Sequence, residues 1–247
     1  MIDRFIFTAM TGAKSAMGQL ATTSHNMANL QTPGFREMLS SFRAVPVTGG
    51  STDSRAFVVD STPGADWTPG AVNATGNPLD VAFQNEGLFA VQRSDGQEAY
   101  TRAGRFHLDA QGFLINSSGL NVLNEQGQSI QIPVGSHDVV IQSNGMITAT
   151  LPGQKFETPV TRLKLVSPAP HTLERQADGL FTSKEDLTSE TDISLVPGSL
   201  EGSNVNAAQA MVQMIAQNRL FDLNIRLVQV AEQNSKTAGA LMSLSRV

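Results

Sequence analysis

The stretch NMANLQTPGFR, residues 26–36, marks the end of the first helical pattern in the chain. Pro33 cannot continue a helix and biases the residue before it toward an extended conformation, while Gly34 permits a turn. Asparagine side chains hydrogen-bond backbone groups at helix ends and tolerate unusual backbone angles. A routine helix stop needs only Pro33 and Gly34. The additional polar residues therefore predict a fixed corner, anchored by Phe35, between the helix and the chain that leaves it.

Upstream of the corner, residues 3–29 predict one long helix. Its apolar or small residues recur at alternating spacings of four and three, which is the heptad pattern of a helix that packs along another helix. The seam consists of Ile6, Met10, Ala13, Met17, Leu20, Ser24 and Met27. The other faces carry mostly Thr, Ser, Gln and Asn with few charges, which suggests packing against protein on several sides. The pattern alone fits an ordinary core helix of a globular domain equally well.

A second long helix is predicted from Asn206 to about residue 243. Asn206 is a good N-cap, and Gln209 follows at the spacing of a capping box. Two adjacent apolar lines then make a wide face. One line contains Ala216, Leu220, Leu223, Leu227, Val230, Leu241 and Leu244, and the other contains Met211, Met214, Phe221, Ile225 and Val228. We expect such a helix to contact a partner helix and a second neighbour at once.

Between the helices the sequence has the pattern of β-structure. Glycines recur every seven to ten residues from Gly87 to Gly153, and short alternating runs such as LFAVQ (88–92) lie between them. Turn pairs such as Asn144-Gly145 separate the runs. This spacing of short strands and turns predicts a β-meander or a small sandwich.

Taken together, these elements predict an α+β fold. Long N- and C-terminal helices are expected to pair as a coiled-coil-like domain, with an all-β meander or sandwich domain inserted between them through extended linkers. The predicted regions are a helical assembly domain (1–32 plus 204–247), an extended linker region (33–75 plus 190–203) and a central β-domain (76–189). A lone helical pair with wide apolar faces is marginally stable, so we expect the ends to order on assembly.

Composition argues against several classes of function. The 247 residues carry a net charge of −5, and residues 41–202 hold eighteen acidic and ten basic side chains, so nucleic acid is not the expected partner. There is no cysteine, and no run approaches the roughly 20 apolar residues of a membrane span. Lys14 stands where a secretory signal would have its apolar core, so we expect any export to use another route.

Candidate catalytic and metal-binding groups do not converge in the sequence. The four histidines lie far apart and show no metal-ligand spacing, and no serine occupies a G-x-S-x-G turn. Asp80 and Glu86 could form a carboxylate pair, but a solvated loop is the better interpretation. The acidic run 184–192 could bind a cation and is more typical of an exposed loop. We therefore predict no catalytic residues, no cofactor and no metal.

The corner resembles the N-x-A-N-x-x-T-x-G-F-[KR] signature of the flagellar axial proteins, which is the rod and hook family. The stretches NPLDVAF (77–83), YTRAG (100–104) and LEGSNVN (200–206) are similar to further motifs of the same family. Separate motifs in the right order, covering both ends and much of the middle, make the resemblance specific. The motif residues are Asn26, Ala28, Asn29, Thr32, Gly34, Phe35, Arg36, Ser203, Asn204 and Val205.

The resemblance implies a structural subunit of the bacterial flagellum. Length and stretches such as FRAVPV (42–47) favour a proximal-rod subunit of the basal body, with the distal rod protein as the alternative. Implied partners are other proximal and distal rod subunits, copies of the chain itself and the flagellar type III export apparatus, and the implied location is the rod within the periplasm. The implied assembly interface comprises Ile6, Met10, Ala13, Met17, Leu20, Met27, Met211, Met214, Ile215, Leu220, Leu223, Leu227, Val230, Leu241 and Leu244.

A rival interpretation of a different class is a secreted β-domain hydrolase or glycan-binding protein with helical tails. That function requires a cleft with converging carboxylates or aromatic side chains. With one tryptophan and one tyrosine in the chain, the sequence supplies few aromatic groups for a sugar platform.

Overall fold

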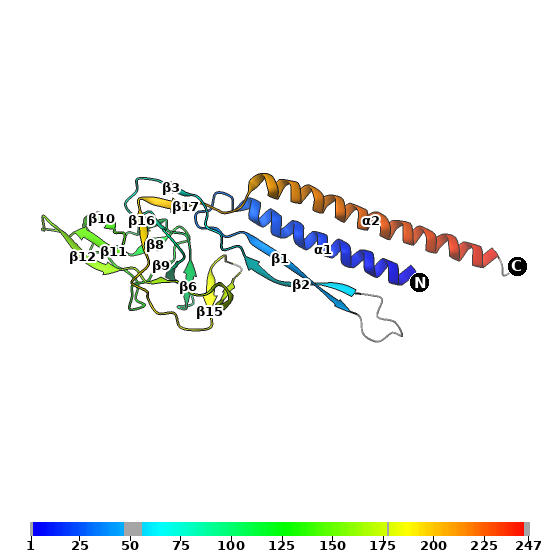
Figure 1. Cartoon of the computed structure of the whole chain (residues 1–247), viewed down its shortest axis with the longest axis horizontal. Helices are drawn as coiled ribbons and strands as arrows, with labels where there is room; N and C mark the ends of the chain where they lie inside the picture. Colours follow the sequence, from blue (N-terminus) through cyan, green and yellow to red (C-terminus); the bar gives the residue numbers. More distant parts are fainter. Residues whose placement is uncertain (1, 47–55, 177, 245–247) are drawn as a thin grey trace. The chain divides into compact units, whose positions relative to one another are not determined.

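A computed structural model describes residues 2–46, 56–176 and 178–244, with an α-helix at each end of the chain (Figure 1). Helix α1 spans Ile2–Ala28, and helix α2 spans Ala207–Leu244. Strands occupy much of the chain between them, with a 3₁₀ turn, η1, at Pro170–Thr172. The strands are β1 (Met38–Pro46), β2 (Ala56–Ala65), β3 (Val72–Ala74), β4 (Val81–Phe83), β5 (Leu88–Gln92), β6 (Glu98–Thr101), β7 (Phe106–Leu108), β8 (Leu114–Asn116), β9 (Asn121–Val122), β10 (His137–Ile141), β11 (Met146–Thr150), β12 (Glu157–Arg162), β13 (Leu165–Val166), β14 (Leu173–Arg175), β15 (Phe181–Ser183), β16 (Leu195–Pro197) and β17 (Ser199–Glu201).

The described strands pair into one eight-stranded sheet and several smaller ones. The largest has the order β14-β15-β6-β5-β9-β8-β7, with β13 paired to β5 beside this path, and a second has the order β10-β11-β12. Two-stranded sheets join β1 to β2, β16 to β4 and β17 to β3. The chain divides into two compact units. The first, helical unit contains α1, β1, β2 and α2, and the second, β-rich unit contains residues 29–37 and 65–205.

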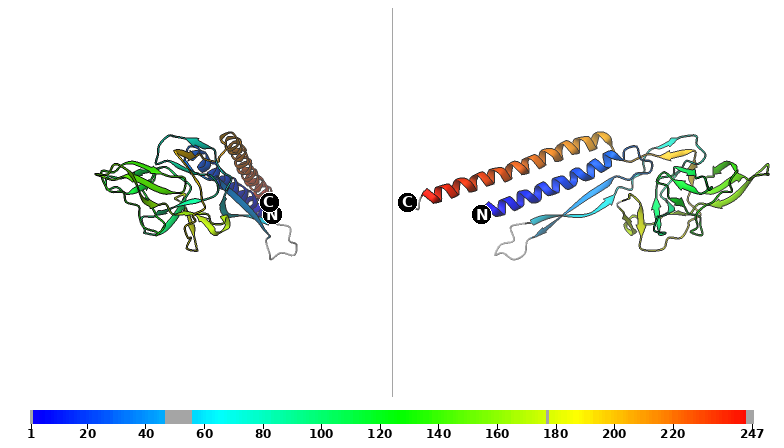
Figure 2. Two further views of the ribbon diagram at one scale, coloured as in Figure 1. Left: turned by 60° about the vertical axis from the view of Figure 1, so that its left-hand side comes forward. Right: turned by 180° about the vertical axis from the view of Figure 1, so that it is seen from behind.

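In the first unit, α1 and α2 lie side by side (Figures 1 and 2). The buried side of α1 carries small residues, namely Ala9, Ala13 and Ala16. Small side chains let two helix backbones approach closely. The two helices meet at Gly12, where an added Cβ would lie 2.6 Å from Oδ1 of the Asn224 side chain on α2.

The predicted fold class is wrong. The chain is mostly β-sheet with one helix at each end, and its strands are not confined to one inserted all-β domain, because β1 and β2 belong to the unit that contains both helices. A coiled-coil pairing along the predicted heptad seam is also not found. Met10 and Met17 of that seam are 55% and 60% exposed, whereas alanines one position away in the sequence are buried. The periodicity identified an apolar line on α1, but two of its large side chains lie at the surface, while Ala13 of the same line is buried.

The core of the second unit is built on β4, β5 and β6. Strand β5, which was predicted as an alternating run, is instead buried on both faces, and its continuous apolar stretch at residues 88–91 suits that position. On one face Phe89 packs against Phe83 and Phe106, with ring centroids 4.3 Å and 5.1 Å apart. Gly104 is required beside this cluster because a Cβ there would lie 1.8 Å from the carbonyl oxygen of Val81.

The opposite face of β5 supports a second, smaller cluster. Leu88 and Ala90 alternate with Phe89 along the strand and pack with Tyr100 and Phe181. Trp67 covers this cluster, with its ring centroid 4.9 Å from that of Phe181.

Within the described residues, neither helix combines the length and apolarity needed to cross a membrane.

The chain's single tyrosine, Tyr100, gives a pH test of this packing. Burial raises the pKa of Tyr100 above its ordinary value, and the negative charge of Glu98 raises it further. Because folding favours the neutral phenol, this contribution to stability is complete below the ordinary pKa of about 10 and is lost as the pH rises above it. We expect the folded chain to show no tyrosinate absorbance at about pH 10, where half the phenol of the urea-unfolded chain is ionised. Half-ionisation at that pH in the folded chain would contradict the packing.

Candidate functional site: a buried polar junction

Most of the corner predicted at residues 26–36 is a hydrogen-bonded turn, which lies in the part of the second unit formed by residues 29–37. The Thr32 backbone N–H donates to the carbonyl of Asn29 at 3.2 Å, and the Phe35 N–H donates to the carbonyl of Thr32 at 3.2 Å. The Thr32 hydroxyl also bonds Oδ1 of Asn29 at 3.1 Å. The Gly34 N–H then donates to the carbonyl of Glu201 at 2.8 Å, which ties the turn to β17. The motif residues thus fix the turn locally and attach it to a strand far along the sequence.

Gly34 is demanded by two features of this turn. Its φ angle is 68°, in the left-handed region that favours glycine. An added Cβ would also lie 2.5 Å from the carbonyl carbon and oxygen of Arg102. These contacts are backbone atoms, which cannot move aside as the end of a flexible side chain can. A residue with a Cβ therefore does not fit at position 34.

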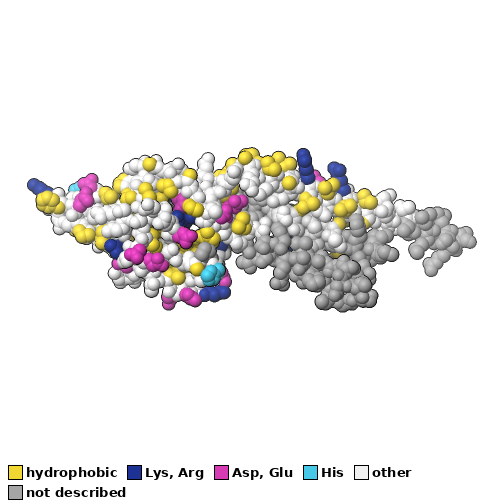
Figure 3. Space-filling view, in the orientation of Figure 1, with side chains coloured by type: hydrophobic (Ala, Val, Ile, Leu, Met, Phe, Trp, Pro, Cys, Tyr) yellow, Lys and Arg dark blue, Asp and Glu magenta, His cyan; other side chains and the backbone are white. Residues whose placement is uncertain are grey.

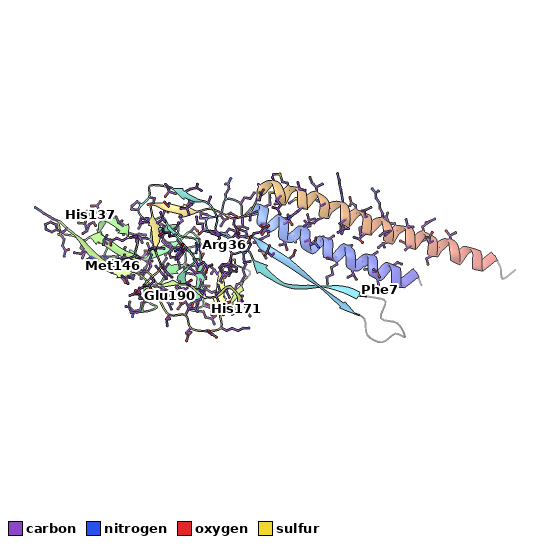
Figure 4. All side chains as sticks on the ribbon, viewed as in Figure 1. Phe7, Arg36, His137, Met146, His171 and Glu190 are labelled. Carbon is purple, nitrogen blue, oxygen red and sulfur yellow. The ribbon has the colours of Figure 1, made fainter. Side chains whose placement is uncertain are left out.

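Beside the turn, two arginines share one buried carboxylate. Nη2 of Arg36 lies 2.9 Å from Oε1 of Glu201, and Nε of Arg102 lies 2.5 Å from Oε2 of the same side chain. All three side chains are at most 4% exposed. Burial lowers the pKa of Arg36, and the attraction of Glu201 opposes that shift. Figure 4 shows Arg36 among the densely packed side chains of the second unit.

Further hydrogen bonds to the backbone surround this ion cluster. Arg102 donates to the carbonyls of Gly87 at 2.7 Å and Asn85 at 2.6 Å, and Arg36 donates to the carbonyl of Thr68. Glu201 Oε1 also accepts from the Gly70 N–H at 2.9 Å. A buried charge group is stable only when its members are paired and hydrogen-bonded in this way. The cluster therefore fixes three loops around one carboxylate.

Asn204 completes the junction. Its Oδ1 accepts a 2.7 Å bond from the Glu37 N–H, and its Nδ2 donates at 3.0 Å to the carbonyls of Asp66 and Thr68. One amide therefore joins the end of the turn to the segment that follows β2. We name the set Gly34, Arg36, Arg102, Glu201 and Asn204 the junction.

Asn26, the first motif residue, has a separate role in the helical unit. Its side chain is buried and pairs with the backbone of Met38 in both directions. Nδ2 donates to the Met38 carbonyl at 3.0 Å, and Oδ1 accepts from the Met38 N–H at 2.9 Å. The amide thus imitates a strand neighbour and holds the start of β1 against the last turns of α1.

The remaining motif residues are placed as follows. Phe35 is buried under Arg175, whose guanidinium lies 4.6 Å from the ring centroid and also donates to the Arg36 carbonyl at 2.7 Å. Val205 is buried, and its N–H donates to the Ser203 hydroxyl at 3.3 Å. Ala28 is exposed. The corner is a helix stop, because α1 ends at Ala28. It is also a specific junction, because Gly34 and Arg36 bond Glu201 far along the sequence.

Sequence reasoning missed two members of the junction, Arg102 and Glu201, and it also missed Arg175, which packs on Phe35 beside it. Arg102 and Glu201 lay within stretches noted for their family resemblance, but no local pattern indicated that they would meet, since 99 positions separate them. Arg175 lay in no motif. Burial lowers its pKa, as for Arg36. The sequence did contain one sign that Arg102 is unusual: it is a charged residue at the end of a short predicted strand, EAYTR (98–102).

The predicted assembly residues fall into two groups. Ala13 is buried, and Ile6, Leu20, Met27 and Met214 are partly buried. Others are exposed, namely Met10, Met17, Met211, Ile215, Leu220, Leu223, Leu227 and Val230. The side chains of Leu241 and Leu244 lie outside the described residues. Hydrophobic side chains along α2 are visible on the face shown in Figure 3.

The arrangement has structural rather than reactive features. His137 and His171 lie apart in Figure 4, and the described part of the chain contains no cluster of three or more His, Asp or Glu able to hold a metal ion. The buried charges of the junction are arginines engaged with one carboxylate and with backbone carbonyls. Their geometry supports positioning of chain segments.

Replacing Gly34 with alanine tests the close approach at the junction. We expect Gly34→Ala to lower the free energy of unfolding of the second unit by more than about 3 kcal/mol, because backbone strain of about 1 kcal/mol is joined by a clash with Arg102. Gly96→Ala is the matched control: Gly96 has φ 83° but nothing within 4 Å of an added Cβ. Urea unfolding monitored by Trp67 fluorescence compares the two. Equal losses would show that the contact with Arg102 contributes nothing.

Comparisons with known proteins place these motifs in a family. The "Flagellar hook protein FlgE/F/G D1 domain" matches residues 82–149, from β4 to β11, and the "Flagellar basal body rod FlgEFG protein C-terminal" matches residues 196–241, which include β17 and most of α2. Both matched regions contribute to the junction, through Arg102 and through Glu201 and Asn204.

Full-length relatives give the same result. The flagellar basal-body rod protein FlgF of Escherichia coli is 41% identical over 254 residues, covering 99% of this chain and 100% of the relative, and FlgF of Salmonella typhimurium gives the same figures. FlgG of Bacillus subtilis is 28% identical over 256 residues, covering 93% of this chain and 96% of the relative. The chain therefore belongs to the flagellar basal-body rod protein family, and within that family it is most like FlgF.

Proposed function

We propose that this chain is a structural subunit of the proximal rod of the bacterial flagellum, which transmits torque for motility. The observation that carries the proposal is the exposed apolar surface of the helical unit, in a chain related to FlgF along its whole length. Val212, Ile215, Leu223 and Val230 on α2 are each more than half exposed. Exposed apolar side chains that gather on the surface of a protein mark a site of contact with another protein. Burying each of them against a neighbour contributes about 1.5–3 kcal/mol.

Of the predicted division, we propose the terminal regions, 1–32 and 204–247, as the assembly region and residues 76–189 as a separate β-region. Residues 38–64 of the predicted linker belong to the same compact unit as the helices and are not proposed as a linker. The exposed positions on both helices support this division, because they give α1 and α2 apolar faces in addition to the face that each uses against the other. The exposed members of the predicted assembly interface are the contact residues proposed for neighbouring subunits.

The proposed partners are other rod subunits, proximal and distal, and further copies of this chain. Relatives named as rod proteins support this proposal. Export through the flagellar type III apparatus and a position in the periplasmic part of the rod are proposals that rest on the family alone. We also propose that the chain is not an enzyme, which is supported by relatives that carry the names of rod proteins.

The distal rod protein is the less supported alternative. The FlgG relative from Bacillus subtilis shares 28% identity with this chain, against 41% for FlgF of Escherichia coli. The hydrolase or glycan-binding interpretation has no support from the relatives named above, which are all rod proteins.

Photo-crosslinking in a flagellated cell tests the proposed function. The cell's own FlgF is replaced by this chain, carrying a photoreactive amino acid at Ile215 on α2 or, as a control that should not crosslink, at Lys155 of the β-rich unit, since both positions are exposed. We expect the chain to purify with basal bodies and the α2 position to crosslink to rod subunits. A functional chain that is absent from basal bodies would contradict the proposal.

A further inference from the structure

The face of α2 that packs against α1 is built from small and polar side chains. Its members recur at intervals of seven residues, which places them on one side of the helix. They are Ala210, Gln217, Asn224 and Ala231, and we call this set the contact face of α2. Both alanines are buried, and Asn224 lies against Gly12 of α1. The contact face thus carries two amides where packed helices usually bury large apolar side chains.

Large apolar side chains lie on other faces of both helices. Met10 and Met17 of α1 are more than half exposed, and so are Leu223 and Val230 of α2. A pairing of α1 with α2 through these side chains would remove more apolar surface from water than the observed pairing does. Apolar burial alone therefore favours a different arrangement of the two helices, and another feature must select the observed one.

Gly12 and Asn224 supply that feature through their shapes. An added Cβ at Gly12 would lie 2.6 Å from Oδ1, 3.1 Å from Cγ and 3.3 Å from Nδ2 of Asn224. The amide thus occupies the space in which any other residue at position 12 would have its Cβ. Nδ2 of Asn224 also donates to the Leu220 carbonyl at 2.8 Å, which holds the amide in this position. The side chain therefore fits opposite a glycine.

The contact residues are unfavourable choices for stability alone. Oε1 of Gln217 is buried and accepts no hydrogen bond from the described residues, which destabilises a fold. Gly12 lies in the interior of α1, where glycine is less favourable than alanine. Polar residues between paired helices fix the register and the choice of partner at a cost in stability. The composition of this contact is therefore that of a specificity device.

We propose that Gly12 and Asn224 select the register in which α1 and α2 pair, and that they thereby keep the large apolar side chains of both helices free for neighbouring subunits. A slide of α2 by one helical turn would bring Asn224 opposite Thr8 or Ala16, each of which has a Cβ in the space that the amide needs. Gly12 and Asn224 are positioning residues that act on the helices themselves. The consequence for neighbouring subunits rests on the proposed function.

Gly12→Ala tests the contact by the sign of its effect on the melting temperature of the full chain. Helix propensity alone predicts a rise. We expect a fall of about 2–4 °C, because the new Cβ displaces the amide of Asn224. In an Asn224→Ala background the amide is absent, so the same Gly12→Ala change should raise the melting temperature. Circular dichroism at 222 nm follows the unfolding. A rise in both backgrounds would overturn the inference.

Spin labels measure the register directly, because the chain contains no cysteine. The labels are attached through Ser24→Cys on α1 and Gln229→Cys on α2, since both positions are exposed. The helices run in opposite directions, so the labels lie on opposite sides of the Gly12–Asn224 contact (Figure 1). Pulsed electron paramagnetic resonance should give one distance, and Asn224→Ala should add a second population displaced by about 5 Å, the length of one helical turn. Asn218→Ala, at an exposed position of α2, is the matched control and should leave one distance.

One unchanged distance in the folded Asn224→Ala chain would overturn the inference. Purification of basal bodies separates the two proposals. If the register does not change in Asn224→Ala while the unaltered chain enters basal bodies and supports swimming, the inference fails and the proposed function stands. If the second population appears but the unaltered chain is absent from basal bodies, Gly12 and Asn224 keep their role in the register and the proposed function fails.

Discussion

Replacing Glu201 with glutamine is expected to lower the free energy of unfolding of the β-rich unit by about 3–5 kcal/mol. The substitution keeps the size of the side chain but removes the only carboxylate that contacts both Arg36 and Arg102, among the described residues. Both guanidinium groups are buried and would lose the carboxylate that they share. Urea unfolding, monitored by Trp67 fluorescence, measures the loss.

An exposed ion pair supplies the matched control. Glu174 and Lys184 also form a salt bridge, with Nζ 2.7 Å from Oε1, but their side chains are 57% and 83% exposed. Glu174→Gln should change stability by less than about 1 kcal/mol, because water solvates both charges when the pair is broken. Similar losses for the two variants would mean that burial of the junction has no energetic consequence.

Replacing Leu223 with aspartate is expected to abolish motility while leaving the isolated chain folded. Leu223 is 56% exposed on α2, so in the free chain the substitution costs only the helix propensity difference, which is below about 1 kcal/mol. In an assembled rod the same position would lose about 1.5–3 kcal/mol of apolar burial and would place an unpaired charge at an interface. Swimming in soft agar and circular dichroism of the purified chain together measure both effects.

Asn218→Asp is the control for added charge on the same helix. Asn218 is exposed, and the substitution preserves its shape while adding one negative charge and removing no apolar surface. We expect cells that carry Asn218→Asp to swim. Full motility with Leu223→Asp would count against the assembly surface, and loss with both variants would point to charge alone.

The sequence predicted local elements well. The predicted helices at 3–29 and from Asn206 to about 243 match α1 (Ile2–Ala28) and α2 (Ala207–Leu244), because capping residues and Pro33 act on their immediate neighbours. Asn206 caps α2 as expected, with Oδ1 accepting from the Gln209 N–H at 3.1 Å. The corner was likewise predicted from local chemistry, at residues 26–36, and its turn lies within residues 29–37.

The sequence failed where partners had to be assigned. Apolar periodicity located a line through Met10 and Met17 but could not show that Ala9 and Ala16 would be buried instead, since small residues contribute little to an apolar pattern. The pairing of Arg102 with Glu201 depends on β-strand topology between distant segments, which no periodicity encodes. For the same reason the fold class was wrong: strand signals in residues 38–65 were taken as linker, whereas β1 and β2 belong to the helical unit.

Hydrogen exchange of the full chain, alone and with purified rod subunits, tests the central claim most directly. The amides of residues 207–237, which carry the exposed apolar side chains of α2, should exchange more slowly when partners are present, while β5 and β6 should be protected equally in both samples. That result would show that the helical surface is covered by assembly. Unchanged exchange throughout α1 and α2, under conditions where the subunits assemble, would contradict the account.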